Sequence, residues 1–468
     1  MQDPRPRHIV LLSSPGMGHL IPLASFARHL ARHHHFAITL ITHPTDHSDS
    51  AGYRSFADSL SDEVNVVSLP SLPPDAFPDT MAEARVFLTI RANLPHLRSL
   101  LRSLESTAPL AALVVDPFCL DAFDVAAELR LPVYLFSTSS CMLLSFAFHL
   151  PALDASFQRE YRDLPEPFRL PGCVPVQGKD LIEPIQDRGK ETYKLFLNAM
   201  KRFPEAKGVL ANSFEDLEPG AVKGLKEGEG RPPVYPVGPL VWTVPDEEHE
   251  CLGWLDRQPR GSVVYVSFGS GGTLTLAQTR ELALGLEISG QRFLWAAKSP
   301  HESEANAAYL SAKKNEKNPL DFLPEGFLER TKDLGFIVAS WVPQVQVLGH
   351  ASTGGFLTHC GWNSTLESIV NGVPLIAWPL YAEQKMNAIQ LTEDVKLALR
   401  PKVTESGLVG REEIARVVRC LMEGEEGKRL RKRAKELSDA AGRALGPGGS
   451  SIRAMADVAR EWMDASRP

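Results

Sequence analysis

The sequence predicts an α/β protein of two doubly wound domains, each a parallel β-sheet covered by helices on both faces. At 468 residues the chain exceeds what one hydrophobic core ordinarily serves, so two or more domains are expected. Short apolar, β-rich runs alternate with helical segments through the first half, and the same alternation starts again in the second half. Between the halves, residues 232–250 are rich in proline and then acidic, which is typical of an interdomain linker.

Each expected strand is a short apolar run bounded by turn residues. These runs are 8–13, 36–42, 64–69, 112–116 and 133–138 in the first half, and 262–270, 292–298, 336–340, 354–359, 374–380 and 396–401 in the second. Residues 20–33 are amphipathic, 301–319 form a polar surface loop, and 412–462 have a charged helical pattern. The expected division is an N-terminal domain at 1–240, a linker at 241–254, a C-terminal domain at 255–450 and a final helix at 451–468.

The composition excludes several classes of protein. A formal net charge of −7 provides no basic field, so neither nucleic acid nor an anionic lipid surface is an expected partner. The six cysteines are scattered without a C-x-x-C pair, which favours free thiols in a reducing compartment over disulfides or a zinc site. The N-terminus is polar and runs into a strand, unlike a signal peptide, and polar residues break the apolar region 134–153, unlike a membrane span. A cytoplasmic protein without membrane insertion is therefore expected.

Two loops that follow expected strands have the composition of anion-binding sites. Residues 360–364 (CGWNS) open a helix, where free backbone N–H groups attract phosphate, with His359 as a further donor and Glu367 one turn later. An ordinary N-cap explains Asn or Ser at this place equally well. Residues 267–272 (SFGSGG) form either a second phosphate-binding loop or a simple glycine-rich turn.

Two candidate acid–base residues follow strands of the first half. His19 ends the segment SPGMGH, whose glycines let the loop approach a ligand closely, although a lone histidine is equally typical of a structural or exposed position. Asp116 ends the run ALVVD at the carboxyl edge of the same sheet, where it either orients a histidine or caps the next turn. Asp121 and Asp124 compete for this role, but their place is that of a helix start.

The stretch 341–384 carries the strongest signal. It reads WVPQVQVLGHASTGGFLTHCGWNSTLESIVNGVPLIAWPLYAEQ and resembles the plant secondary product glycosyltransferase box, the signature of family 1 UDP-sugar glycosyltransferases. Nearly end to end, the segments SPGMGHLIPL, DAFDVA, LPGCVPV, YPVGPLV, YVSFGSGGTLT, FLPEGFLERT and LIAWPLYAEQKMNA are similar to the phenol-directed subgroup, which includes hydroquinone (arbutin-forming) glucosyltransferases. This resemblance implies the GT-B architecture, with two Rossmann-like doubly wound domains facing across a cleft and a last helix that crosses back onto the N-terminal domain. It also implies a UDP-sugar donor and a small-molecule acceptor.

The resemblance further implies a role for each donor-site residue. The uracil is expected on Trp341, with Val342 and Gln344 nearby, the diphosphate on Ser270, His359, Asn363 and Ser364, the ribose on Glu367, and the sugar on Trp362, Glu383 and Gln384. The family associates a terminal Gln with glucose, so Gln384 indicates UDP-glucose. No cofactor and no metal are expected, because the chain contains no D-x-D pair and protein donors with a helix N-terminus take the place of the ion. The consecutive residues His33–His35 point in different directions on a helix and are interpreted as a solvated helix end.

Within this family, the resemblance makes His19 the general base and Asp116 its partner. Asp116 would fix the tautomer of the imidazole and stabilise its protonated form. His19 would take the proton of an acceptor hydroxyl, whose oxygen attacks the anomeric carbon of UDP-glucose in a single inverting displacement that gives a β-glucoside. A phenol suits a histidine base because its pKa is about 10, although nitrogen, sulfur or carbon attack by the same fold stays open.

The acceptor pocket is expected in the N-terminal domain, where the sequence specifies least. Its apolar candidates, each equally well explained by core packing, are Met17, Phe87, Phe118 and Phe148. Pro117, directly after Asp116, departs from the pattern of the phenol-directed subgroup. The acceptor preference of that subgroup is therefore not carried over to this chain. UDP-glucose and small phenolic aglycones are the expected partners of a monomer. An NAD-dependent oxidoreductase lacks support because no G-x-G-x-x-G with a following acidic residue occurs, whereas a non-catalytic nucleotide-sugar-binding protein stays an alternative.

Overall fold

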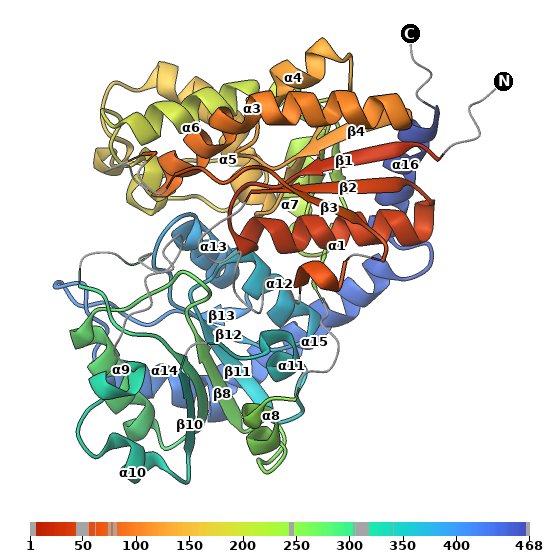
Figure 1. The fold of residues 1–468 in the computed structure, drawn as a ribbon. Helices are drawn as coiled ribbons and strands as arrows, with labels where there is room; N and C mark the ends of the chain where they lie inside the picture. The colour runs from red at the N-terminus through yellow and green to blue at the C-terminus, as the bar shows by residue number, and fades with distance from the viewer. Residues whose placement is uncertain are drawn as a thin grey trace. The chain divides into compact units, whose positions relative to one another are not determined.

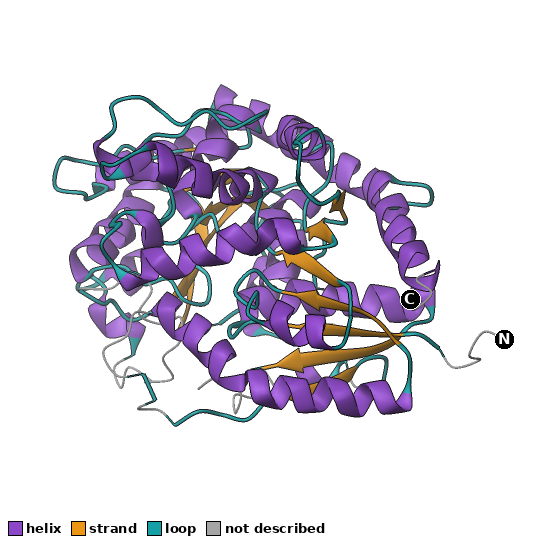
Figure 2. Cartoon of the chain, turned by 90° about the horizontal axis from the view of Figure 1, so that it is seen from above, coloured by secondary structure: helices purple, strands orange, loops and turns teal. Residues whose placement is uncertain are grey.

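The protein consists of two compact units, each built on its own parallel β-sheet. The structure is a computed structural model that describes residues 6–43, 56–60, 62–73, 76–77, 82–242, 248–302, 305, 318–339 and 341–464. The first unit comprises Met1–Trp242 and Arg443–Pro468, and the second comprises Thr243–Gly442. In both units the strands lie between helices, which confirms the predicted α/β class (Figures 1 and 2).

The sheet of the first unit has, within the described residues, seven parallel strands in the order β3-β2-β1-β4-β5-β6-β7. They are β1 (His8–Leu12), β2 (Ala37–Thr42), β3 (Asn65–Ser68), β4 (Leu110–Val115), β5 (Val133–Ser137), β6 (Gly208–Ala211) and β7 (Val234–Pro236). The first five confirm the predicted strands. The sequence did not indicate β6 and β7. The interpretation of 232–250 as an interdomain linker is wrong for its first residues, because Val234–Pro236 is a strand that pairs with β6 at the sheet edge.

Helices cover both faces of this first sheet, as its continuous apolar strands require. They are α1 (Met17–His34), α3 (Ala82–Thr107), α4 (Ala122–Glu128), α5 (Cys141–Ser156), α6 (Glu191–Arg202), α7 (Pro219–Lys226) and α16 (Ser450–Asp464). The helices α1 and α3 lie on opposite faces (Figure 1). The last helix, α16, contacts α1, β4 and β7. Trp462 is buried there against the rings of Phe26, Phe36 and Tyr134, and the carboxylate of Glu461 accepts hydrogen bonds from the hydroxyls of Tyr134 and Tyr235.

The sheet of the second unit has the order β10-β9-β8-β11-β12-β13 in the described residues, again with parallel pairing. Its strands are β8 (Val263–Ser267), β9 (Arg292–Ala297), β10 (Gly335–Ala339), β11 (Thr353–Thr358), β12 (Leu375–Ala377) and β13 (Ala398–Leu399). The last two are shorter than the predicted runs 374–380 and 396–401. Of the predicted loop 301–319, residues 303–304 and 306–317 lie outside the described residues, as does Ser340 of the predicted strand 336–340.

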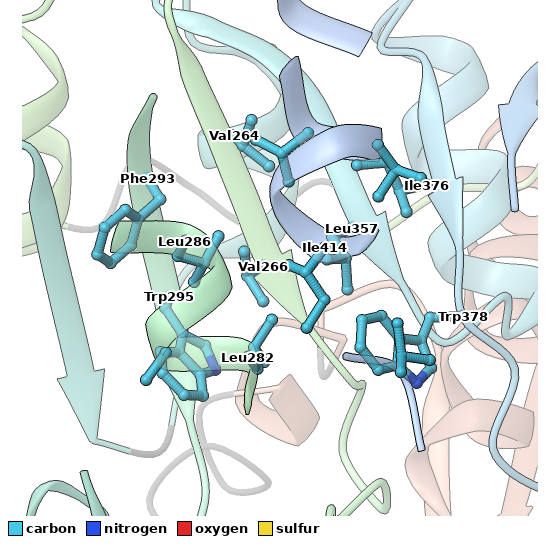
Figure 3. Close-up of a cluster of buried hydrophobic side chains, with 14 of the residues drawn as sticks. Val264, Val266, Leu282, Leu286, Phe293, Trp295, Leu357, Ile376, Trp378 and Ile414 are labelled. Atoms are coloured by element: carbon cyan, nitrogen blue, oxygen red, sulfur yellow. The ribbon is translucent and has the colours of Figure 1, made fainter. Parts of the chain in front are cut away.

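Helices of the second unit cover its sheet. They are α8 (Glu250–Leu255), α9 (Leu276–Ser289), α10 (Phe327–Thr331), α11 (Gln344–Gly349), α12 (Trp362–Val370), α13 (Gln384–Ile389), α14 (Arg411–Glu423) and α15 (Glu425–Leu445), the last of which extends into the first unit. An apolar core lies on the side of the sheet that faces α9 and α14. Val264 and Val266 of β8 lie among side chains of α9 and α14 (Figure 3). The helices α9 and α14 approach closely at Gly285, where a Cβ would lie 2.5 Å from Cβ of Ile414.

Two further predictions can be compared with this fold. The six cysteines are all free thiols, as their spacing predicted. Within the described residues, none of the helices combines the length and the apolar character that crossing a membrane requires.

Candidate active site

A histidine–aspartate pair lies at the carboxyl edge of the first sheet. Asp116 directly follows β4, and His19 stands in the first turn of α1, which follows the neighbouring strand β1. Nδ1 of His19 lies 2.6 Å from Oδ2 of Asp116. The carboxylate is fully buried, whereas the imidazole is 18% exposed. A carboxylate on Nδ1 fixes the proton on that nitrogen, so Nε2 is left as the basic atom.

Neighbouring groups hold this pair in place. The other carboxylate oxygen of Asp116, Oδ1, accepts a hydrogen bond from the backbone N–H of Phe118 at 3.0 Å. The hydroxyl of Thr138, after β5, lies 3.3 Å from Nδ1 of His19. The competing carboxylates are elsewhere: Asp121 pairs with Arg91, and Asp124 pairs with an arginine of α6 at the surface. Asp121 is the N-cap residue of α4 and Asp124 lies in its first turn, so both stand at a helix start, as predicted.

His43 is a buried histidine near this edge that sequence reasoning did not single out. It follows β2 directly, and both its ring nitrogens lack a hydrogen-bond partner among the described residues. Burial lowers its pKa to about 4, although the charge of Asp116 acts in the opposite direction. His43 is therefore uncharged at neutral pH.

An aromatic cluster adjoins the imidazole of His19. The ring of Phe118 lies edge-on to it, with centroids 5.3 Å apart. Phe87 of α3 and Phe196 of α6 pack on Phe118 at 4.9 and 5.6 Å, and on each other. Phe196 was missed from the sequence, where the only signal was the helical periodicity of 191–202. These rings form an apolar, aromatic wall beside the basic nitrogen.

The other two acceptor candidates have different surroundings. Phe148 of α5 packs against Phe203 and beneath the guanidinium of Arg231, and in the described part of the chain no ring contact joins it to the aromatic cluster. Met17 opens α1 two residues before His19 and is half-buried.

The predicted phosphate-binding loops come together at the carboxyl edge of the second sheet. Loop 268–272 follows β8, and His359 follows β11, the neighbouring strand. A Cβ on Gly269 would lie 2.4 Å from Nε2 of His359, and one on Gly361 would lie 2.5 Å from it, so a side chain at either position would displace the imidazole. Burial, reinforced by the charge of Lys298, lowers the pKa of His359 to about 3. The imidazole is thus a neutral group, whose Nδ1 has no partner among the described residues.

The start of α12 lies beside these loops. The N-cap residue of this helix is Gly361, which has no side chain to cap it. Asn363 and Ser364 are therefore not N-cap residues, and the ordinary N-cap interpretation of them does not apply. Both residues lie in the first turn, where backbone N–H groups lack intrahelical acceptors. The helix start therefore presents donors suited to an anion.

Glu367 belongs to a half-buried polar network one turn further along α12. Nε2 of Gln344 donates to Oε2 of Glu367 at 2.5 Å and to the hydroxyl of Ser364 at 2.9 Å. Oε1 of Gln344 accepts from the hydroxyl of Tyr265 at 3.1 Å. Burial raises the pKa of Glu367 to about 7, and the bond from Gln344 opposes this shift. Tyr265, within β8, was not predicted because it looks like an ordinary strand residue.

The remaining donor-site residues of the second unit differ in exposure. Trp341 is 57% exposed, which is unusual for an indole and leaves a face open for stacking, whereas Val342 is buried. Trp362 and Gln384 are buried, and Glu383 is half-buried.

Gln384 and the loop before it are fixed by hydrogen bonds. Oε1 of Gln384 accepts from the backbone N–H groups of Leu380 and Tyr381 at 2.8 and 3.0 Å. Nδ2 of Asn387 donates to the carbonyl of Cys360 at 2.9 Å, which ties α13 to the loop before α12. Because the side-chain carbonyl of Gln384 accepts these two bonds, its amide NH₂ is the donor end of the side chain.

Comparison with known proteins agrees with these local arrangements. Residues 237–410 match the family model described as UDP-glucoronosyl and UDP-glucosyl transferase. The chain is 54% identical to the hydroquinone glucosyltransferase of Rauvolfia serpentina over 460 residues, 97% of each chain. It is 49% identical to Phytolacca americana UGT2, solved with UDP-2fluoro-glucose and pterostilbene, with a TM-score of 0.90 over 98% of this chain and 100% of that one. A UDP-glucosyltransferase from Polygonum tinctorium capable of glucosylating indoxyl, solved with 3,4-dichloroaniline, is 48% identical, with a TM-score of 0.91 over 98% and 99%. The resemblance found in the sequence is thereby confirmed, and the chain belongs to the family of UDP-glucoronosyl and UDP-glucosyl transferases.

Proposed function

We propose that this protein is an inverting glucosyltransferase that transfers glucose from UDP-glucose to a hydroxyl of a small phenolic acceptor and gives a β-glucoside. The observation that carries this proposal is the His19–Asp116 pair, with its 2.6 Å contact and its basic Nε2 beside an aromatic wall. Two comparisons support it: the relative named for hydroquinone, and the neighbour solved with a fluorinated UDP-glucose and a stilbene. The family membership makes the NAD-dependent oxidoreductase alternative wrong.

On the acceptor side, the first unit deprotonates and orients the phenol. Nε2 of His19 takes the phenolic proton as the oxygen attacks the anomeric carbon, and the buried carboxylate of Asp116 stabilises the imidazolium that forms. Phe87, Phe118 and Phe196 provide edges and faces on which an aromatic ring packs. A proton acceptor beside an aromatic wall favours phenols over aliphatic alcohols, whose pKa values are much higher.

On the donor side, the second unit binds UDP-glucose. The exposed indole of Trp341 stacks on the uracil, and Glu367 accepts hydrogen bonds from the ribose. The N-terminal turn of α12, His359 and Ser270 bind the diphosphate and stabilise the charge of departing UDP. Glu383 and the amide of Gln384 bind the glucose hydroxyls, with Trp362 beside them. These protein donors take the place of the divalent metal that other sugar transferases use, so we propose that the reaction is metal-independent. We further propose that the protein is a cytoplasmic monomer.

The test measures UDP release from UDP-glucose with and without a panel of simple phenols, followed by product mass and by NMR of the anomeric centre. Acceptor-dependent release, a hexose mass gain and a β-linkage are expected. The His19→Ala variant should lose turnover while it still binds UDP, because the imidazole belongs to the acceptor side. If the wild-type protein binds UDP-glucose but transfers glucose to none of the phenols, the phenolic acceptor class is wrong. If no acceptor of any class supports UDP release, it is a binding protein and not an enzyme.

A further inference from the structure

Lys298 is a cation at the carboxyl edge of the second sheet that no motif in the sequence singled out. It directly follows β9, which pairs with β8, and β8 pairs with β11 on its other side. The glycine-rich loop 268–272 follows β8, and His359 follows β11. The three segments therefore leave adjacent strands at the edge where ligands of open α/β sheets bind.

The ammonium group of Lys298 holds the glycine-rich loop from one side. Its Nζ donates to the carbonyl oxygen of Ser270 at 2.5 Å and also to that of Gly269. In a trans peptide the C=O and the following N–H point in opposite directions, so the N–H groups of Ser270 and Gly271 point away from Lys298. No described residue accepts a backbone hydrogen bond from either N–H. Successive N–H groups of this kind form a concave anion-binding site.

The positive charge of Lys298 has no acidic partner in the part of the chain that the structure describes, since its contacts are the two carbonyls. His359, which faces it from the loop after β11, is uncharged at neutral pH. Burial lowers the pKa of Lys298 to about 8, so most molecules keep the charge at pH 7. A half-buried cation without a carboxylate partner is less favourable than a paired one, and an anionic ligand relieves this penalty.

We propose that Lys298 is a positioning residue for the diphosphate of the UDP-sugar, an inference that rests on the donor site of the proposed function. By holding both carbonyls, it directs the N–H groups of Ser270 and Gly271 toward the diphosphate. Its charge also supplies the positive potential that UDP meets as it leaves with developing negative charge.

The experiment compares binding of UDP and of uridine by calorimetry at pH 7, because only UDP carries the diphosphate. In Lys298→Met we expect UDP to bind about tenfold more weakly or worse, in line with the loss of one charge-assisted hydrogen bond, while uridine binding is unchanged. Lys298→Arg should restore most of the UDP affinity. Lys332→Met removes a lysine of the same unit that pairs with Glu329 at the surface, and it should bind both ligands as the wild type does.

Each outcome bears on the inference. Equal weakening of UDP and uridine would show a merely structural role, and unchanged UDP affinity would overturn the inference outright. If Lys298→Met does not fold, Lys298→Gln keeps a donor to the loop carbonyls without the charge and should show the same selective loss. A wild-type protein that fails to bind UDP would refute the proposed function itself, whereas intact wild-type binding with unaffected Lys298 variants would refute only this inference.

Discussion

At the scale of single residues, the proposed catalysis depends on what Asp116 does to His19. Its buried carboxylate is fixed by the N–H of Phe118 and holds Nδ1 at 2.6 Å. In Asp116→Asn the amide keeps the shape but neither fixes the same tautomer nor stabilises the imidazolium. We expect kcat to fall by about a hundredfold or more, with little change in KM for UDP-glucose. Steady-state kinetics with a simple phenol measure this, and Asp121→Asn, which only loses a surface pair with Arg91, should behave as the wild type.

A second residue-scale prediction concerns Glu367, whose pKa is raised to about 7. In the proposed donor site, Glu367 above pH 7 is a carboxylate that can accept hydrogen bonds from both ribose hydroxyls, and below pH 7 its protonation removes one acceptor. We expect uridine affinity to fall severalfold from pH 8 to pH 6, measured by calorimetry because uridine does not ionise in this range. Glu367→Gln should show a flat profile. A wild-type affinity that is independent of pH would contradict this role for Glu367.

The sequence predicted the residues of the site unevenly, and the reason is physical. His19 and Asp116 were candidates because each follows a strand, and the carboxyl ends of parallel strands meet at one edge, but only the family resemblance implied their roles. Phe196, Tyr265 and Lys298 could not be found, because each lies in a segment whose own pattern is that of an ordinary helix or strand. Their contacts with the site arise only when β8 and β9 pair in the second sheet and α6 packs on the first.

At the scale of elements, the strands expected in advance were short apolar, β-rich runs bounded by turn residues. β6 and β7 have only four and three residues, and β7 ends in Pro236, a residue that signals a linker and is tolerated at a sheet edge. The helices around them have clear amphipathic patterns, but a pattern does not tell which neighbour a helix packs against. The pairing of the short strands β6 and β7 is therefore set by the tertiary context.

The glycine-rich loop gives an element-scale prediction with a matched control. Gly269 and Gly290 both have positive φ, of 71° and 67°, so alanine at either position should cost about 1 kcal/mol of backbone strain. A Cβ on Gly269 also displaces the ring of His359, whereas one on Gly290 meets nothing within 4 Å. We expect Gly269→Ala to weaken UDP binding about tenfold or more and Gly290→Ala to leave it unchanged. Calorimetry and urea unfolding separate the two effects, and equal UDP affinities in both variants would contradict the prediction.

At the scale of the whole molecule, the repeat of the strand–helix alternation predicted two sheets, and the structure has two. Periodicity alone did not predict that residues 443–464 join the first unit, because their charged amphipathic pattern is compatible with either sheet. Packing decides it: Trp462 is buried among aromatic residues of the first unit, and Glu461 bonds two tyrosines there.

Buried histidines in both units make the stability of the molecule depend on pH. Burial lowers the pKa of His43 in the first unit to about 4 and that of His359 in the second to about 3, below the ordinary 6.5. Between these values and pH 6.5 the unfolded chain binds protons that the folded chain does not, so the free energy of unfolding falls as pH falls. The raised pKa of Glu367 acts in the opposite direction between pH 4.5 and 7 and offsets part of this loss.

We therefore expect the urea midpoint to be lower at pH 5 than at pH 7.5, with His43 alone contributing a loss of about 3 kcal/mol once the pH approaches 4. His43→Leu should reduce this dependence for the first unit, because leucine has no ring nitrogen to protonate, whereas His29, whose pKa burial also lowers to about 4, still contributes. His96→Gln, at an exposed position of α3, should keep the wild-type slope. Urea unfolding followed by fluorescence at several pH values measures the slope. If His43→Leu retained it, the acid sensitivity of the first unit would have to come from groups other than this histidine.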